Sequence, residues 1–338
     1  MAKIKKLSIF DAIKIKKLTS VLESRDLPSL VKMMVISPFI HLQSILPINF
    51  KKLPEAYVSI EDDEINGMVM LKAAHGNAYK WHIMKLYLTP NSYIAGRQLV
   101  DYILSKFGAY GANTFSVIFN NSYEELLDLF SKGCGFRLCS HENLWKMSEV
   151  KLEYKESDNI FRPFKNSDAK EVCEIYNDAI FPHFRYSLAK SPGEFKDRLF
   201  QGFSSISQFK YVMTDGFDKK ILSYVEIQTN DNKNYFVEIV LPQPYEEYYP
   251  TVLGFAVNQI IRRRKDFNMF VWNKNYMNTA KTNADFMRNQ GFKHIQNNAV
   301  LVKDFYKTIS SYEKIAKPAI AFSEINRKPA FEVAPKEV

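Results

Sequence analysis

The stretch Lys80-Trp-His-Ile-Met-Lys-Leu-Tyr-Leu-Thr-Pro90 decides the fold, together with the helix that follows it. Apolar and aromatic side chains fill most of residues 80–88, which predicts a strand, and Pro90 ends it because proline has no amide hydrogen for sheet pairing. After a short turn, apolar residues recur at helical spacing and share one face, namely Leu99, Val100, Ile103, Leu104 and Phe107. A further strand over residues 114–119 completes a strand–helix–strand unit that is typical of α/β proteins.

The same succession of elements occurs twice in the chain. In the second half a strand stops at Pro242, a helix follows over residues 251–265, and after one more strand a last helix ends at Gly291-Phe292. The corresponding helix of the first half ends at Gly135-Phe136. Glycine ends a helix readily because it adopts the left-handed conformation, and the phenylalanine after it is expected in the core. The order of elements therefore predicts two units of one kind in tandem.

The length of 338 residues is enough for two domains of ordinary size. We expect one domain at residues 1–150 and a second at 158–308, with a polar stretch between them. Residues 309–338 contain several prolines among lysine, glutamate and alanine, and they show little periodicity. We therefore expect a flexible C-terminal tail there.

Both predicted domains begin with helix-capping residues. Ser8 is followed by Asp11 three positions later, and Asn166 is followed closely by Asp168. Side-chain oxygens of such residues accept hydrogen bonds from the free amide groups at a helix N-terminus. Each pair therefore predicts the start of a helix.

Composition argues against several classes of protein. No apolar run reaches the roughly 20 residues that a membrane-spanning helix requires, and lysines interrupt any signal-peptide core near the N-terminus. The three cysteines, Cys134, Cys139 and Cys173, have no metal-ligand spacing and fit a reducing compartment. We therefore expect a cytoplasmic protein with no transmembrane segment, no disulfide framework and no metal site.

The net charge of +9 has two interpretations. Solvated helix faces explain it most simply, whereas an acidic partner such as a nucleotide, a nucleic acid or an anionic membrane is the alternative. No motif of a nucleic-acid-binding fold accompanies the charge, so no specific nucleic-acid binding is expected.

The order of elements resembles the GCN5-related N-acetyltransferase (GNAT) superfamily over nearly the whole chain. The resemblance implies an α/β fold with two tandem copies, each with a mixed, mostly antiparallel central sheet flanked by helices. It also implies that acetyl-CoA binds where two central strands separate. The strand before the main helix would face the pantetheine arm, and the N-terminus of that helix would face the pyrophosphate, because its free amide groups bind anions.

In the first copy the family's phosphate-binding turn, (Gln/Arg)-x-x-Gly-x-(Gly/Ala), corresponds to Asn91-Ser-Tyr-Ile-Ala-Gly96. Gly96 matches the last small position, whereas Asn91 and Ile94 depart from the pattern. Arg97 could add a phosphate contact. The resemblance therefore implies a set of acetyl-CoA contacts at Leu86, Leu88, Ile94, Ala95, Gly96, Arg97 and Asn121.

The resemblance also suggests catalytic candidates in the first copy. Asn120 or Asn121 matches an asparagine that lies near the thioester in the family. His82 is a candidate general base for the amine, and Tyr123 is nearby in sequence. The family's tyrosine general acid falls on Phe130 or Ser131, so the usual acid is expected to be missing. The catalytic candidates are therefore His82, Asn120 and Tyr123.

The second copy departs further from the family pattern. Its turn reads Gln243-Pro-Tyr-Glu-Glu-Tyr-Tyr-Pro250 and contains no glycine. Its prolines remove amide donors, and its glutamates would repel a pyrophosphate. The tyrosine position falls on Met287. Glu226 and Glu238 lie on adjacent strands where the family often places its base, although water-exposed strand carboxylates are the other interpretation. We expect this copy to be degenerate for acyl-CoA binding.

The function implied by the resemblance is acyl-CoA-dependent N-acyltransfer, in which an unknown amine attacks acetyl-CoA directly through the first copy. The alternative is a non-catalytic GNAT-like binding or regulatory module that binds a metabolite or a protein partner. The expected partners are acyl-CoA and an amine acceptor, with a protein partner or a homo-oligomer as further possibilities.

Overall fold

The computed structural model describes residues 3–8, 11, 19–23, 55–74, 77–89, 92–147, 160–197, 207–216 and 219–305, with 19–23 described by their backbone. The predicted boundary near residues 150–158, the predicted tail at 309–338, and Pro90 and Asn91 lie outside these ranges. The elements up to Asp304 pack as one unit. Among the described residues, no helix is both long and apolar enough to cross a membrane.

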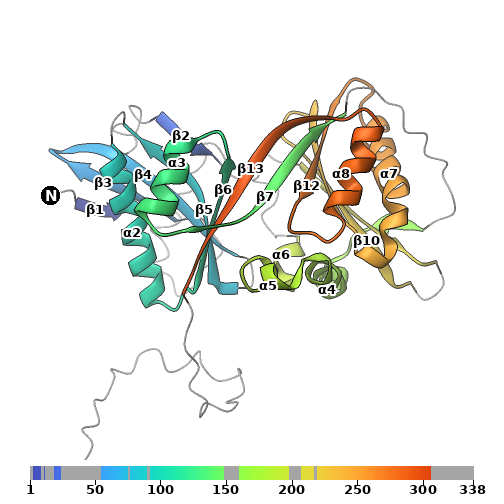
Figure 1. Cartoon of the computed structure of the whole chain (residues 1–338), viewed down its shortest axis with the longest axis horizontal. Coiled ribbons are helices and arrows are strands. Elements are labelled where there is room, and N and C mark those ends of the chain that lie inside the picture. Colours follow the sequence, from blue (N-terminus) through green and yellow to red (C-terminus); the bar gives the residue numbers. More distant parts are fainter. Residues whose placement is uncertain are drawn as a thin grey trace, which may run out of the picture. The chain divides into compact units, whose positions relative to one another are not determined.

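The first half of the chain contributes seven strands and two longer helical segments to the described structure (Figure 1). Its strands are β1 (Lys3–Lys6), β2 (Thr19–Glu23), β3 (Glu55–Glu61), β4 (Glu64–Ala74), β5 (Asn77–Leu88), β6 (Thr114–Asn120) and β7 (Arg137–Lys146). Its helices are α2 (Tyr93–Ala109) and α3 (Glu124–Asp128), and α3 continues into the π-helical turn η3 (Leu129–Gly133).

The second half repeats this order with additional short helices. Its strands are β8 (Phe161–Pro163), β9 (Ser207–Thr214), β10 (Ile221–Thr229), β11 (Asn234–Val240), β12 (Asn268–Lys274) and β13 (Lys293–Asp304). Its α-helices are α4 (Ala169–Ala179), α5 (Pro182–Leu188), α6 (Pro192–Phe195), α7 (Tyr249–Ile261) and α8 (Ala280–Asn289), and its 3₁₀ turns are η4 (Asn166–Asp168) and η6 (Gln243–Tyr248).

The described strands form one continuous sheet in the order β1-β3-β4-β5-β6-β13-β7-β12-β11-β10-β9-β8, and β2 pairs with β5 off this path. The pairs β5–β6 and β11–β12 are parallel, whereas the other described pairs are antiparallel. The expected mixed, mostly antiparallel sheet is therefore confirmed, with one parallel pair in each half.

The closing strands of the two halves are exchanged. β13 of the second half pairs with β6 of the first, for example Leu301 with Val117. β7 of the first half pairs with β12 of the second, for example Trp145 with Val271. β7 and β13 also pair with each other. β7 has 10 residues and β13 has 12, and this length lets each strand pair with the sheet of the other half.

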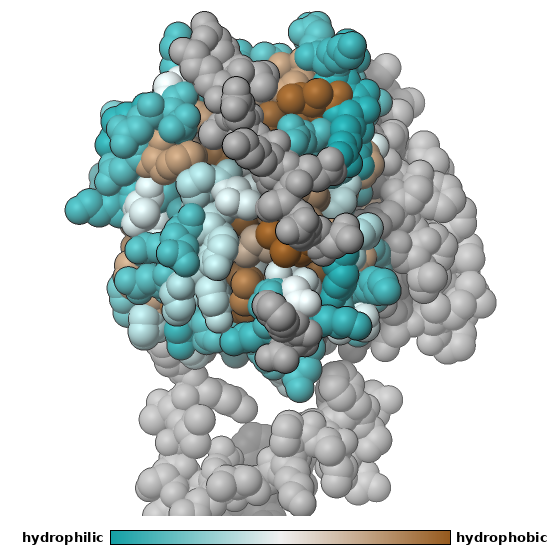
Figure 2. Space-filling model, turned by 90° about the vertical axis from the view of Figure 1, so that its right-hand side faces the viewer, coloured by the Kyte–Doolittle hydropathy of each residue, from teal (hydrophilic) through white to brown (hydrophobic). Residues whose placement is uncertain are grey.

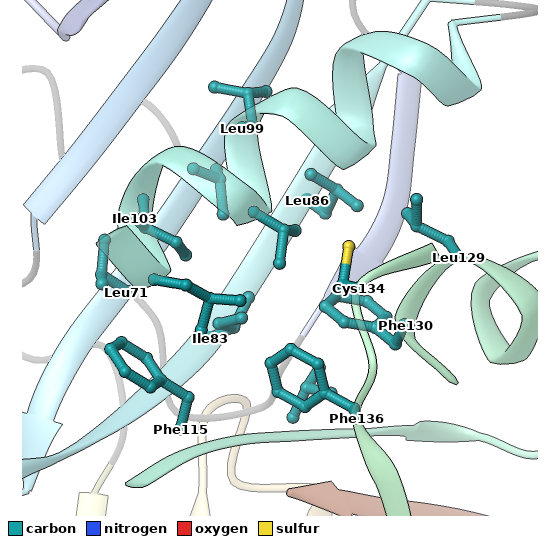
Figure 3. Close-up of a cluster of buried hydrophobic side chains, with 14 of the residues drawn as sticks. Leu71, Ile83, Leu86, Leu99, Ile103, Phe115, Leu129, Phe130, Cys134 and Phe136 are labelled. Atoms are coloured by element: carbon teal, nitrogen blue, oxygen red, sulfur yellow. The ribbon is translucent and has the colours of Figure 1, made fainter. Parts of the chain in front are cut away.

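Helix α2 covers one face of the first half. Its predicted apolar face is confirmed, since Leu99, Val100 and Ile103 are fully buried. Figure 3 shows this face lying over β5, with Phe130 and Phe136 closing the same core from the η3 side. Phe130 packs edge-on against Phe136 at 5.3 Å between ring centroids. Burial of one such ring stabilises the fold by about 2–3 kcal/mol.

Helices cover both faces of the second half. Along β10 the side chains alternate, so that Val225 joins a core with α7, whereas Tyr224 joins a core with α4. The predicted helix end at Gly291 is confirmed by its φ of +78°, and Phe292 is buried. Figure 2 shows one face of the molecule, on which hydrophilic residues surround smaller hydrophobic patches among the coloured atoms.

The turn after the first strand has the same structure in both halves. Asn166 was expected to cap the helix, but the N-cap is Lys165, and the Asn166 side chain accepts a hydrogen bond from the Asp197 amide instead. Asp11 accepts a hydrogen bond of 2.8 Å from the Ser8 amide and an ion pair of 2.8 Å from Lys5 on β1. Asp168 accepts a hydrogen bond of 2.8 Å from the Lys165 amide and forms an ion pair of 2.7 Å with Arg162 on β8. In each half the carboxylate thus fixes the turn after the first strand to that strand. Residues 9–10 and 12–18, where the first helix was expected, lie outside the described ranges.

Candidate functional site

The two parallel strands of the first half separate where β5 carries a bulge. They are paired from Lys80–Thr114 to Ile83–Val117. On the other edge of β5, Ile83 pairs with Leu71 and Lys85 pairs with Met70, so Met84 is the extra residue. A bulge bends the bulged strand and increases its twist. The last β5–β6 pair lies directly before Met84, so the separation begins at the bulge.

The helix after β5 begins without a side-chain cap. α2 starts at Tyr93, Ser92 makes no side-chain hydrogen bond to its amide groups, and its first turn has no acidic residue. Such an N-terminus has free amide groups and the positive end of the helix dipole, which together favour an anion. Tyr93 donates a hydrogen bond of 3.3 Å to Asp128 of α3 and so reaches from this terminus to the neighbouring helix.

The predicted acetyl-CoA contacts divide into buried and exposed positions. Leu86, Leu88, Ala95 and Gly96 are buried, and the side chains of Leu86 and Leu88 belong to the core. A Cβ at Gly96 would lie 3.0 Å from Leu88 Cδ1, which shows that glycine allows α2 to pack closely on β5. Ile94 is 70% exposed at the helix N-terminus.

Arg97 is also exposed, and its guanidinium lies 3.6 Å from the Asp101 carboxylate one turn further along α2. In this position it forms an ordinary helix-surface ion pair. A role in phosphate binding would require Arg97 to turn away from Asp101.

The edge of β5 beyond the bulge is already paired. Strand β2 runs antiparallel to it, with Thr19 opposite Leu88 and Glu23 opposite Lys85. This is the edge that the separation from β6 would otherwise leave open. A pantetheine arm that used the backbone of Leu86 and Leu88 would need the position that β2 holds.

His82 lies one pair before the strand separation. It is opposite Ser116 on β6, and its Nδ1 lies 2.5 Å from the Ser116 hydroxyl. Burial lowers the pKa of the imidazole, Glu194 opposes this, and nearby lysines lower the pKa further. His82 is therefore neutral near pH 7, and a neutral imidazole can accept a proton.

The second half covers the face of β5 that carries His82. Lys80 is two residues away on the same strand, so its side chain points to the same face. Its ammonium group donates to three carbonyls at the end of α5, Tyr186 at 3.1 Å, Ser187 at 3.3 Å and Ala189 at 2.8 Å. The C-terminal end of α5 thus lies over this part of the first half.

The other predicted catalytic residues have structural partners. The Asn120 side chain accepts a hydrogen bond of 3.0 Å from the Ser122 amide. The backbone amide of Asn121 donates a hydrogen bond of 2.8 Å to the Asn297 carbonyl of β13. Tyr123 precedes α3 and is 54% exposed. Asn120 and Asn121 therefore fix the turn after β6, while the hydroxyl of Tyr123 lies on an exposed side chain.

The position of the family's general acid is part of the core. Phe130 is fully buried, and the Ser131 hydroxyl donates to the Leu127 carbonyl. Cys134 is also buried, which raises the pKa of its thiol to about 12. None of these three side chains is an acid that could serve a leaving thiolate near pH 7.

In the corresponding region of the second half, β11 and β12 are paired from Asn234–Asn268 to Glu238–Trp272, so these strands also part before β11 ends at Val240. β10 and β11 keep a regular register from Tyr224–Val240 to Thr229–Tyr235, without a bulge in β11. Directly after β11, the Leu241 carbonyl accepts a hydrogen bond of 3.3 Å from the Thr279 hydroxyl. The turn η6 then replaces the glycine-bearing turn of the first half.

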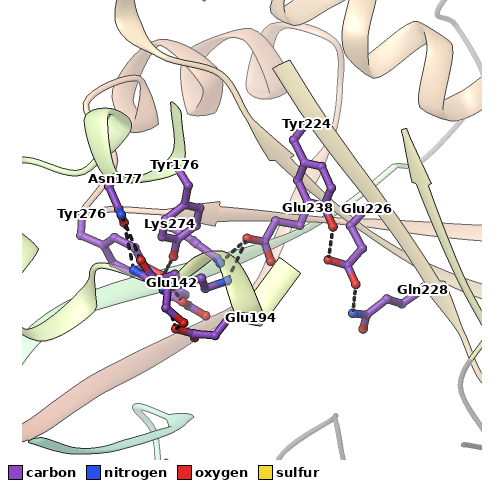
Figure 4. A network of polar contacts seen from close by, with 12 residues as sticks. Glu142, Tyr176, Asn177, Glu194, Tyr224, Glu226, Gln228, Glu238, Lys274 and Tyr276 are labelled. Carbon is purple, nitrogen blue, oxygen red and sulfur yellow. Dashed lines mark hydrogen bonds and ion pairs between the residues drawn. The ribbon is translucent and has the colours of Figure 1, made fainter. Parts of the chain in front are cut away.

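A polar cluster fills the junction between β7, β11, β12 and the helices α4 to α6 (Figure 4). Lys274 forms an ion pair with Glu238, and Lys190 lies 3.9 Å from the same carboxylate oxygen. The Tyr276 hydroxyl donates a hydrogen bond of 2.8 Å to the carboxylate of Glu142, which lies on the exchanged strand β7. Although burial opposes it, the surrounding acidic groups and tyrosines raise the pKa of both lysines, so they stay charged.

The two carboxylates considered as bases in this half are both engaged. Glu238 belongs to the polar cluster described above. Glu226 accepts a hydrogen bond of 2.9 Å from the Tyr224 hydroxyl and one of 2.8 Å from the Gln228 side-chain amide. Sequence reasoning missed Lys190, between α5 and α6, and Lys274, at the end of β12, because an isolated lysine gives no signal of burial.

Comparison with known proteins supports the fold. No protein-family model and no curated protein sequence matches the chain. Among solved structures, a tandem GNAT protein from the clavulanic acid biosynthesis pathway is 8% identical with a TM-score of 0.59, and the match covers 91% of this chain and all of that one. A GCN5-related N-acetyltransferase from Sphaerobacter thermophilus is 12% identical with a TM-score of 0.55 over 91% and 97% of the two chains.

The structure of a putative acetyltransferase from Pyrococcus horikoshii is 10% identical, with a TM-score of 0.52 over 90% of both chains. At these identities the likeness concerns the fold. Each of these three matches covers both halves of the chain. The chain thus adopts a tandem GNAT fold.

Proposed function

We propose that the protein is an acyl-CoA-dependent N-acyltransferase that binds acetyl-CoA in the first half and transfers the acetyl group to an amine. The observation that carries this proposal is the bulge at Met84, where β5 leaves β6 and leads to the uncapped N-terminus of α2. The second half has neither the bulge nor a glycine in the corresponding turn.

The donor would use two features of the first half. The backbone edge of Lys85–Leu88 offers amide and carbonyl groups to the amides of a pantetheine arm, and the N-terminus of α2 offers free amide groups to the pyrophosphate. Gly96 allows the close contact between helix and strand that holds these two features together. The fit requires that β2 leave the edge of β5.

The amine would react beside His82. The neutral imidazole accepts a proton from the attacking nitrogen, and the Ser116 hydroxyl holds the ring through Nδ1. The nitrogen–carbon bond forms, the carbon–sulfur bond breaks, and CoA leaves as a thiolate. Because Phe130 stands where the family has a tyrosine, the thiolate takes its proton from water.

The alternative is a non-catalytic GNAT-like module. It is supported by the pairing of β2 along the donor edge and by the absence of an acid at Phe130 and Ser131. In that case the fold would serve binding or regulation. The cytoplasmic location stays a prediction under either proposal.

The test is calorimetric titration of acetyl-CoA into the wild-type protein and into Ile94→Glu. Ile94 is the better position than Gly96, because its exposed side chain can change without disturbing the packing against Leu88. A glutamate there places a negative charge where the pyrophosphate would lie, and it also favours the helix, so loss of binding is not loss of fold.

We expect at least tenfold weaker binding in Ile94→Glu. The matched control is Ser105→Glu, an exposed position on the same helix but far from its N-terminus, which should bind as the wild type does. If acetyl-CoA binds neither the wild-type protein nor a variant in which β2 no longer pairs with β5, the transferase proposal is contradicted. Equal binding by Ile94→Glu and wild type would place the donor elsewhere.

A further inference from the structure

The edge of β5 at Lys85–Leu88 has a neighbour on each side. On one side it pairs with β4, from Gly67–Leu88 to Met70–Lys85. On the other side it pairs with β2, from Thr19–Leu88 to Glu23–Lys85. A strand has only two edges, and each backbone amide or carbonyl points to one of them. With β2 present, this part of β5 has no open edge.

The hold of β2 on this edge is limited. The strand has five residues, and among the described strands it pairs with β5 alone. Its register also shifts between Ser20 and Leu22, so one residue is left out of the ladder. Short, bulged strands held along a single edge add little stability. β2 is thus paired well enough to cover the edge and weakly enough to be displaced.

We propose that β2 is a built-in competitor of the acyl donor, which covers the Lys85–Leu88 edge in the free protein and leaves it when acyl-CoA binds. The inference rests on the proposed function of this cleft, because both ligands would use the same backbone groups. Acyl-CoA must displace β2 before it binds, so the free energy of β2 pairing is subtracted from the free energy of donor binding. The wild-type protein therefore binds the donor more weakly than a chain without β2 would.

The first test fixes β2 in place. In Ser20→Cys/Tyr87→Cys the two cysteines lie at directly opposed positions of the ladder, where a disulfide can form. The three native cysteines are buried and not in disulfides. We expect the oxidised variant to bind acetyl-CoA at least tenfold more weakly than the same variant after reduction. Ser20→Cys alone, treated in the same way, should show no difference. Equal affinity before and after reduction would overturn the proposal.

Tyr87 is buried, so the second test avoids it. Leu22→Pro removes a backbone amide from β2 and disfavours the strand, whereas Leu22→Ala leaves the backbone intact. Hydrogen exchange measures the amides of Lys85–Leu88 directly. We expect faster exchange there and severalfold tighter acetyl-CoA binding in Leu22→Pro than in Leu22→Ala.

The two measurements separate the two proposals. Equal exchange at Lys85–Leu88 in both variants would show that β2 does not cover the edge and would overturn the inference, whatever the affinity for acetyl-CoA. Faster exchange in Leu22→Pro without acetyl-CoA binding by any variant would overturn the competition and the transferase proposal together, leaving β2 as a structural strand. Binding by the wild type that the disulfide leaves unchanged would overturn the inference and leave the transferase proposal standing.

Discussion

The two halves share one fold but differ where their parallel strands meet the following helix. In the first half, Met84 bulges out of β5, and α2 begins with free amide groups beside Gly96. In the second half, β11 is regular, and side-chain hydrogen bonds and ion pairs fill the corresponding region. The two halves thus differ by one inserted residue in a strand and one retained glycine, and in the first half the backbone edge beyond the bulge is paired with β2.

The cores of the two halves share a strand. On β13, Leu301 joins the core of the first half, while its neighbour Val300 joins a core of the second. We expect Leu301→Ala to reduce the free energy of unfolding by about 2–5 kcal/mol, since it leaves a cavity in a fully buried site. Urea unfolding followed by tryptophan fluorescence measures this loss.

The halves can be monitored separately, because Trp81 lies in the first half and Trp272 in the second. With either one kept as the sole tryptophan, Leu301→Ala should shift both unfolding curves by the same amount. A shift reported by Trp81 alone would show that the halves unfold independently. Val300→Ala serves as the reciprocal change, and a smaller loss is expected because fewer atoms are removed.

A smaller effect is expected at the repeated cap. Both Asp11 and Asp168 are partly buried, which alone would raise their pKa values, but hydrogen bonds and a neighbouring cation lower them below the usual range. Replacement of Asp168 by Asn should reduce the free energy of unfolding by about 1–2 kcal/mol at pH 7, because it removes the ion pair with Arg162.

The pH dependence of this effect has a definite sign. A carboxylate whose folded pKa is depressed stabilises the fold above its unfolded pKa of about 3.9, and that stability is lost as the pH falls through the lower folded value. The difference between Asp168→Asn and wild type should therefore shrink below about pH 4. Asp285→Asn is the control, because its exposed pair with Arg288 should contribute less than about 0.5 kcal/mol. An Asp168→Asn loss that stays constant down to pH 2.5 would contradict this account of the cap.

The smallest effect sharpens the difference between the clefts. Glu247→Lys in the second half replaces a negative charge near the start of α7 with a positive one. We expect the affinity for acetyl-CoA to stay within about twofold of the wild type, because Pro244 and Pro250 still lack amide donors. A tenfold gain in titration calorimetry would place a donor site in the second half after all.

Local patterns predicted the elements of the fold well. The strand before Pro90, the apolar face of α2 and the helix end at Gly291 were all readable, because each depends on residues that are neighbours in sequence. The repeat of the caps at Asp11 and Asp168 was also readable, although the cation that joins each of them was not.

The exchange of β7 and β13 could not be predicted in this way. Alternation of apolar and polar residues shows which face of a strand is buried, but it does not show which strand lies beside it. For the same reason the candidate site was predicted only in part. His82 and Gly96 stay predictions as site residues. Ser116, the contact of Lys80 with α5 and the pairing of the β5 edge gave no sequence signal, because they depend on contacts between distant segments.

The exchanged strands also affect how the chain is made. Thr114 on β6 bonds to Asp304 on β13 across 190 residues of sequence. At ribosomal rates of about 5–20 residues per second, β6 emerges on the order of 10–40 seconds before its partner. During that interval the nascent first half has an unpaired strand edge, which invites association with other chains. Completion of the first half therefore awaits the end of translation of the second, and nascent chains that stop before β13 are expected to be clients of chaperones.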